Sequence, residues 1–138
     1  MKKRLALVLA LCLILTALPI HIVSAASEPE LLFEMEFSGT NGNAVKFAKE
    51  MTESGIVSQI RAEDGNLRYD YCYLFDDCET VLLIDSWADQ HALDVHHASP
   101  MMHEIINLRE KYNLSMMVER YILDEAGIPE KDKAFIRE

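Results

Sequence analysis

The chain has few cysteines, and none of them lies in a metal-binding pattern. Its 138 residues include 3 cysteines, with no CxxC pair and no cluster of cysteine and histidine at zinc-ligand spacing. Cys72 falls in a predicted strand and Cys78 in the turn that follows, where their Cα atoms would lie too far apart for a disulfide. We therefore expect two free thiols and no metal site.

Basic residues are also scarce. Lysine and arginine number 13 against 23 aspartates and glutamates, so the formal net charge is −10. Proteins that bind nucleic acid present clustered lysine and arginine to the phosphates. We therefore expect no nucleic acid partner.

Apolar runs long enough to span a membrane are absent as well. The longest run, Leu5–Leu18, follows the basic start MKKR and precedes small residues around Ala25. A spanning helix needs roughly 18 to 20 apolar residues, whereas this order of segments is typical of a secretory signal peptide. We expect residues 1–25 to be cleaved and the mature protein to be exported, whether secreted, periplasmic or on the cell surface, without stable membrane association. A retained membrane anchor is the alternative.

The remaining sequence has a regular hydrophobic pattern. Four segments with strand-like patterns are predicted to form β-strands: residues 31–38, 67–75, 80–87 and 114–123. The second segment places one set of apolar residues on a single face: Leu67, Tyr69, Tyr71, Tyr73 and Phe75. The third is apolar on both faces between Val81 and Ile84, so both faces must be covered.

Three other segments have the apolar spacing of helices. The first begins near Ala44, the second covers residues 90–97, and the third carries an apolar stripe from Met101 to Tyr112. Their expected boundary residues are Gly55 as a stop or kink in the first, Asp89 as the N-cap of the second, Ser99 and Pro100 as the N-cap and first residue of the third, and Asn113 as its end.

The order strand, helix, strand, strand, helix pair, strand predicts an α+β fold. This order is that of the ferredoxin-like, split βαβ arrangement, in which helices cover one face of a four-stranded antiparallel sheet. The domain would occupy residues 26–123, and residues 124–138 would form a charged C-terminal tail that is helical after Pro129. One layer of helices can cover only one sheet face, so we expect a homodimer in which two sheets face each other.

Three segments, "AEDGNLRYDY", "ETVLLIDSWADQHALDVHHASPMM" and "LREKYNLSMMVERY", resemble the antibiotic biosynthesis monooxygenase family, including its quinol monooxygenase-like members. The resemblance extends from Leu31 to Leu123. The family pattern has an acidic residue and a tryptophan at a strand end, then Ala-Leu, a histidine and Ser-Pro. These are here Asp85, Trp87, Ala92, Leu93, His96, Ser99 and Pro100. The resemblance implies a dimeric α+β barrel and, as in members of known activity, oxidation of an electron-rich aromatic or quinol substrate by O2 without metal, flavin or other cofactor.

Two features depart from the family pattern. Relatives often carry another histidine just after Ser-Pro, where this chain has Met101. A typical relative also works in the cytoplasm, whereas this chain begins with a predicted export signal. Both departures bear on whether the activity of the family transfers to this chain.

The candidate catalytic residues come from the strand end and the helix after it. His96 lies about seven residues into a helix that runs back over the sheet, a rise of about 10 Å that places it above Asp85. His96 would be the base that deprotonates the substrate, and Asp85 would orient the imidazole and stabilise its charged form. We expect His97 on a different, exposed face of the helix. The expected binding wall for a small aromatic or quinone-like molecule is Trp87, Tyr69, Tyr71 and Asn66.

Other interpretations stay open. A histidine on the inner side of a helix is more often packed in the core than catalytic, and the tyrosines face Asp85 only if the turn at residues 76–79 has odd length. A haem-degrading branch of the same fold would have its iron-ligating histidine near Ile106, where this chain has none, although His103 could substitute. A third interpretation is a non-catalytic module that binds a small molecule in the same pocket.

Overall fold

The computed structural model describes residues 29–124 and 126–137, and the predicted signal peptide, residues 1–25, lies outside these ranges. The elements follow in the order β1 (Leu31–Ser38), α1 (Asn43–Glu53), α2 (Ile56–Ile60), β2 (Asn66–Tyr73), β3 (Thr80–Trp87), α3 (Gln90–His97), α4 (Met101–Lys111), β4 (Ser115–Ile122) and α5 (Glu130–Lys133).

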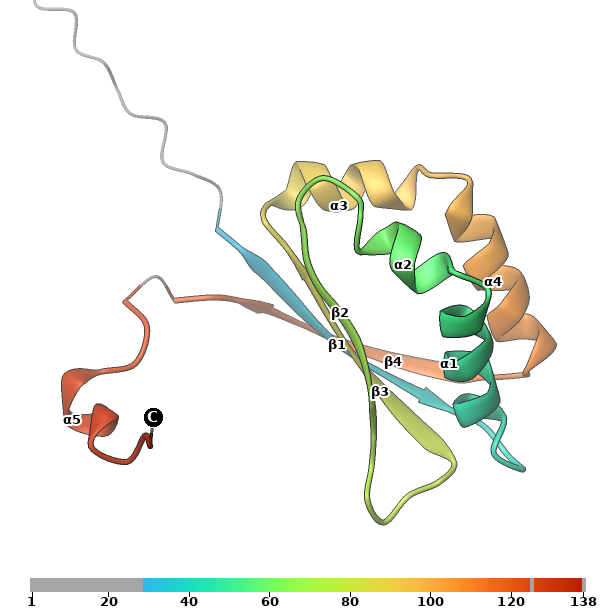
Figure 1. Cartoon of the computed structure of the whole chain (residues 1–138), viewed down its shortest axis with the longest axis horizontal. Coiled ribbons are helices and arrows are strands. Elements are labelled where there is room, and N and C mark those ends of the chain that lie inside the picture. Colours follow the sequence, from blue (N-terminus) through green and yellow to red (C-terminus); the bar gives the residue numbers. More distant parts are fainter. Residues whose placement is uncertain (1–28, 125, 138) are drawn as a thin grey trace, which may run out of the picture.

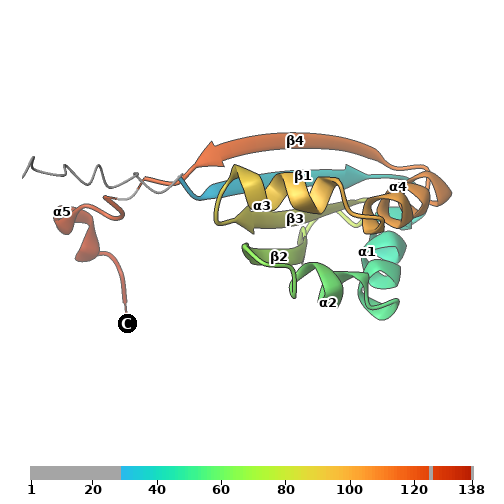
Figure 2. The ribbon, with the colours of Figure 1, turned by 90° about the horizontal axis from the view of Figure 1, so that it is seen from above.

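The four strands form one antiparallel sheet in the order β2-β3-β1-β4, and α1 to α4 lie on one side of it (Figure 1). Seen from above, β4 and β2 are the two edges of the twisted sheet (Figure 2). This arrangement confirms the predicted ferredoxin-like α+β fold. Within the described ranges, every helix is too short or too polar to cross a bilayer.

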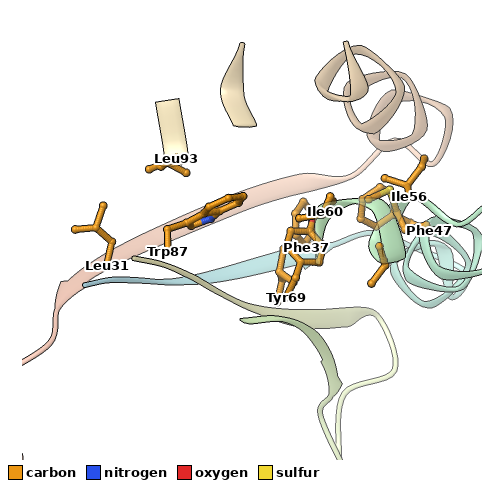
Figure 3. Close-up of a cluster of buried hydrophobic side chains, with 11 residues drawn as sticks. Leu31, Phe37, Phe47, Ile56, Ile60, Tyr69, Trp87 and Leu93 are labelled. Carbon is orange, nitrogen blue, oxygen red and sulfur yellow. The ribbon is translucent and has the colours of Figure 1, made fainter. Parts of the chain in front are cut away.

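The core lies between the helices and the sheet face that they cover. Alternate residues of β1 and β3 point into it, and Leu31, Phe37 and Trp87 are all less than 5 % exposed. Figure 3 shows these side chains with Phe47 of α1 and Ile60 of α2. Burial of a large apolar side chain contributes roughly 1.5–3 kcal/mol, so this cluster stabilises the packing of the helices on the sheet.

Most of the predicted helix boundaries are confirmed. Gly55, with φ of +86°, separates α1 from α2, which are two short helices in place of one. The Asp89 carboxylate accepts a hydrogen bond from the Ala92 backbone N–H at 2.8 Å and so caps α3. Asn113, in the left-handed region with φ of +51°, follows the end of α4.

The predicted N-cap at Ser99 is wrong. Its hydroxyl is buried without a hydrogen-bond partner, and α4 begins at Met101 after Pro100. The Ser99 N–H still donates to the His96 carbonyl at 2.9 Å. Its N–H therefore extends the last turn of α3, while its hydroxyl caps neither helix.

Strand β2 differs from the prediction at both ends. Its register shifts just before Arg68, and Leu67 is 53 % exposed instead of sharing a buried face with Tyr69. The strand ends at Tyr73, and Phe75 lies fully exposed in the hairpin loop. The β-bulge inserts one unpaired residue and so changes the face to which Leu67 points. The alternation of apolar residues alone did not predict this bulge.

The sheet face opposite the helices is open. On β3, Val81 and Leu83 point into the core, so the alternating residues Leu82 and Ile84 point to this open face. Leu82 and Ile84 are half-buried there. Strand β4 is exposed along its whole length. This open face is where we expect the second copy of a homodimer.

The hairpin and the tail complete the described chain. Cys72 in β2 and Cys78 in the β2–β3 loop are free thiols, as expected. The helical turn predicted after Pro129 is α5, which lies away from the sheet and the other helices (Figure 1).

Candidate active site

A cavity of about 290 Å³ lies between the sheet and the α3–α4 pair. Its walls are mainly apolar and come from β1, β3, β4 and α4, including Phe33, Met35, Leu83, Ile105 and Val118. The polar or charged side chains that reach it are Tyr69, Asp85, His96, His97 and Arg109. An apolar cavity with a few convergent polar groups is the usual form of a small-molecule site.

Asp85 is a buried carboxyl on the inner face of β3. It is 2 % exposed and pairs in register with Phe33 on β1 and Tyr69 on β2. Burial raises the pKa of Asp85 from 3.8 to about 6. The polar N–H of the nearby Trp87, the charge of His96 and a hydrogen bond from Asn66 each lower this pKa, but by less than burial raises it. The Asn66 side-chain amide donates to Asp85 at 3.4 Å. Asp85 therefore keeps its proton to a higher pH than an exposed aspartate does.

His96 is 4 % exposed and stacks against the buried Trp87 indole, with ring centroids 4.9 Å apart. Its Nδ1 lies 2.5 Å from the Glu63 carboxylate, which is part-buried beside it. The expectation that Asp85 would hold the ring is thus not what the structure shows. Asp85 acts on His96 through its charge, and the hydrogen-bonded carboxylate is Glu63.

The turn between α2 and β2 brings Glu63 to His96. Gly65 in this turn has φ of +82°, and a Cβ built there would lie 2.5 Å from the Ala92 Cβ of α3. The Gly65 carbonyl also accepts a hydrogen bond from Ala88 N at 2.8 Å. Only glycine combines this conformation with so close an approach. The sequence EDGN is typical of a turn, but a turn signal does not show which helix the turn packs against.

The tyrosines face Asp85, which settles the question that the β2–β3 turn left open. Tyr69 pairs with Asp85 and lines the cavity, and burial raises its pKa well above its usual range, so it remains a neutral phenol. Tyr71 lies beyond it against Phe47, with ring centroids 6.0 Å apart. The Tyr71 hydroxyl is buried without a hydrogen-bond partner, and the Trp87 N–H likewise completes no hydrogen bond.

The six residues expected at the site therefore separate into two groups. Tyr69, Asp85 and His96 line the cavity. The other three stand behind these: Asn66 holds Asp85, Trp87 packs on His96, and Tyr71 packs on Tyr69.

Two cavity residues were missed or placed elsewhere by sequence reasoning. Arg109, on the polar side of the α4 stripe, reaches the cavity and lies 4.0 Å from the Met116 sulfur. His97 is exposed as expected, yet it also lines the cavity, with its ring 5.8 Å from that of His96. Burial lowers the pKa of His97. Long side chains extend beyond the face on which their Cα lies, and apolar periodicity does not account for this.

Two further observations limit the alternatives. His103, the substitute iron ligand in the haem interpretation, is exposed and does not line the cavity. Within residues 29–124 and 126–137, no three histidine, cysteine, aspartate or glutamate side chains are grouped so that they could hold a metal ion.

His96 also lines a second, more open hollow of about 410 Å³. It is lined by the α2–β2 turn and by α3, with Glu63, Asp64 and His91 among its polar residues. His96 borders both spaces. One imidazole is therefore shared by an apolar cavity and an open hollow that carries carboxylates.

Solved structures share this fold. SnoaB from Streptomyces nogalater, described as a cofactor-independent oxygenase, is 13 % identical, with a TM-score of 0.59 over 70 % of this chain and 95 % of SnoaB. A protein from Deinococcus radiodurans, provisionally assigned to the antibiotic biosynthesis monooxygenases, is 20 % identical, with a TM-score of 0.61 over 69 % of this chain and 93 % of its own. A conserved protein of unknown function from Bacteroides thetaiotaomicron, a possible oxidoreductase, is 12 % identical, with a TM-score of 0.63 over 70 % of this chain and 100 % of its own. Identities this low establish likeness of fold alone.

The sequence itself gives the assignment. A comparison with curated proteins finds no match. The antibiotic biosynthesis monooxygenase family matches residues 34–108, which include β2, β3, α3 and most of the cavity wall. Because this match covers more than half of the 138 residues, the chain belongs to the antibiotic biosynthesis monooxygenase family.

Proposed function

We propose that the protein is a cofactor-independent monooxygenase that oxidises a small electron-rich aromatic or quinol molecule with O2. Membership of the family supports an oxygenase role. The finer proposal rests on one observation, which is that Asp85 and His96 both line the same apolar cavity. Both side chains are less than 5 % exposed. Burial of the Asp85 carboxyl lowers the stability of the fold, whereas an apolar side chain at this position would not, so the carboxyl is a candidate for a functional role.

The chemistry begins with removal of a proton. A phenol or hydroquinone gives an electron to O2 readily only as its anion, and a histidine is the side chain best suited to take that proton near neutral pH. His96 would accept it, and the ionised Asp85 would stabilise the resulting imidazolium. The apolar walls keep this charge interaction strong because they exclude water.

The following steps need no reductant other than the substrate. The substrate anion passes one electron to O2, and the substrate radical and superoxide combine through a new C–O bond to give a peroxide. His96 then returns its proton to the outer oxygen, the O–O bond breaks, and the second substrate hydrogen leaves with that oxygen as water. One oxygen atom stays on the substrate, which has lost two hydrogens.

The cavity indicates the kind of substrate. A volume of about 290 Å³ is at the lower end for ligand pockets, which fits a small ring system. The Tyr69 ring and the apolar side chains of β1 and α4 give flat contacts to such a ring, and Arg109 offers one cation for an oxygen or acidic substituent.

The test is oxygen consumption by the purified protein with a panel of hydroquinones. On an active compound, His96→Ala should lower turnover by about 10² to 10⁴, because general-base contributions are usually of that size. The matched control is His103→Ala, which changes an exposed histidine outside the cavity and should leave turnover unchanged. Melting temperatures of both variants show whether they remain folded.

Two outcomes would reject the proposal. Equal turnover per folded molecule in His96→Ala and in the unmodified protein would remove His96 from the mechanism. Binding of the aromatic panel without any oxygen uptake would favour the non-catalytic binding module.

A further inference from the structure

His96 has two ring nitrogens, and the structure places one of them on the hollow side. Nδ1 faces Glu63, which lines the open hollow, while the histidine also borders the apolar cavity. The α2–β2 turn that carries Glu63 lies beside α3 in Figure 1. One nitrogen of the imidazole therefore contacts a residue of the hollow, while the same side chain lines the cavity.

The contact at Nδ1 decides where the ring carries its proton. A carboxylate can only accept a hydrogen bond, and a neutral imidazole has a single N–H. At 2.5 Å from the Glu63 oxygen, Nδ1 must be the protonated nitrogen. Nε2 then carries the lone pair and is the nitrogen that can accept a proton.

We propose that Glu63 is the positioning residue of His96: it fixes the proton on Nδ1, directs the basic Nε2 toward the cavity, and holds the imidazolium until the proton is returned. This inference rests on the proposed function, because it names the residue that makes His96 a base on the cavity side. Glu63 itself does not line the cavity, and its hydrogen bond to the site is the one to His96, while its charge also raises the pKa of Asp85.

Asp85 does not take this role. Its side-chain hydrogen bond comes from Asn66, and its influence on His96 is electrostatic. Glu63 is in addition held in place, because the neighbouring Gly65 fits against Ala92 with no space for a side chain. The carboxylate and the imidazole therefore come from two elements that are packed together.

The first test needs no substrate. In protein with ¹⁵N-labelled histidine at alkaline pH, where the imidazoles are neutral, the His96 signals should show the proton on Nδ1. In Glu63→Leu the acceptor is lost, and the signals should shift toward the Nε2–H form or a mixture. In Glu63→Gln the side-chain carbonyl can still accept from Nδ1–H, so the Nδ1–H form should persist without the charge. Asp64→Asn, an exposed neighbour on the same hollow, is the matched control and should leave the His96 signals unchanged.

The second test measures turnover on a compound that the protein oxidises. Glu63→Leu should lower kcat by about tenfold to a hundredfold, as is usual when the partner that orients a functional histidine is removed, with KM little changed. Glu63→Gln should lower kcat less, and Asp64→Asn should not lower it.

The result that overturns the proposal is a proton on Nε2 in the unmodified protein, or a His96 spectrum that is the same in Glu63→Leu. Should no aromatic compound be oxidised while the spectra behave as expected, the proposed function fails and the role of Glu63 in fixing His96 stands. If Glu63→Leu does not fold, the comparison of Glu63→Gln with Asp64→Asn still decides the charge effect on kcat.

Discussion

The environment of the Asp85 side chain conflicts with stability. Its carboxyl is 2 % exposed, and burial raises its pKa from 3.8 to about 6. The folded state therefore holds the proton to a higher pH than the unfolded state does. Stability from this group is present at low pH and is lost as the pH rises from about 4 to about 6.

Replacing Asp85 with asparagine should remove this loss. We expect Asp85→Asn to be more stable than the unmodified protein above pH 6, by on the order of 3 kcal/mol for a shift of this size, with the difference vanishing below about pH 4. Denaturant unfolding of both proteins across this pH range measures it. A constant difference at all pH values would mean that the carboxyl does not titrate as its burial indicates.

At the residue scale, the sequence is informative wherever one element decides the position. Asp85 and Trp87 follow from the alternation of β3, and His96 from the helical spacing of α3, so the sequence alone places all three on the inner side. Glu63 was not found, because its position depends on how a turn packs on another element. Arg109 was missed because its long side chain reaches beyond the face of its own helix.

At the scale of elements, the α2–β2 turn connects two parts of the candidate site. It carries Glu63, and its Gly65 rests against Ala92 of α3. Gly42 offers a comparison, because it also has a positive φ, +69°, but a Cβ added there would have no atom within 4 Å. The two glycines therefore share a left-handed backbone conformation and differ in steric crowding.

Gly65→Ala should destabilise the protein more than Gly42→Ala. Both variants should lose about 1–2 kcal/mol from the left-handed backbone conformation, and Gly65→Ala roughly 1–3 kcal/mol more from overpacking against Ala92. Denaturant unfolding of the two variants gives the difference. If the two losses are equal, the turn can move away from α3 at no cost, and the contact does not hold Glu63 in place.

The same scale shows where prediction of the fold succeeded and where it did not. Periods of two and of about four residues were sufficient to identify the strands and helices of the domain, because most of these elements turn their apolar residues to one side. The bulge at Leu67 and the missing cap at Ser99 were not predicted. Both depend on the backbone path between elements, which local sequence signals describe only weakly.

At the scale of the whole molecule, the open sheet face remains to be explained. Leu82 and Ile84 of β3 point to this face, which continues across β1 to β4. Neither face of β4 is buried. This face carries both apolar residues and the carboxylates of Glu34, Glu36 and Glu119, and two copies related by a twofold axis would cover it on both. We propose that the sheets of two chains pack face to face.

Light scattering at micromolar concentration should therefore give twice the mass of the exported chain. Ile84→Asp should convert the dimer to a monomer, because it adds a carboxylate between those of Asp70 and Glu34, its register neighbours on the open face. Val95→Asp changes an exposed apolar residue on α3, away from that face, and should leave the dimer intact. A stable monomer of the unmodified protein at this concentration would contradict the barrel arrangement.

The exposed β4 also bears on the order of events in folding. Met116 and Val118 of this strand form one wall of the cavity, yet β4 joins the domain through its ladder with β1 and buries little apolar surface. Local opening begins where few apolar contacts are lost, so β4 is expected to join the sheet last and to leave it first. In a single chain, the cavity is then the last part to form during folding, and its β4 wall is the first part lost on local unfolding.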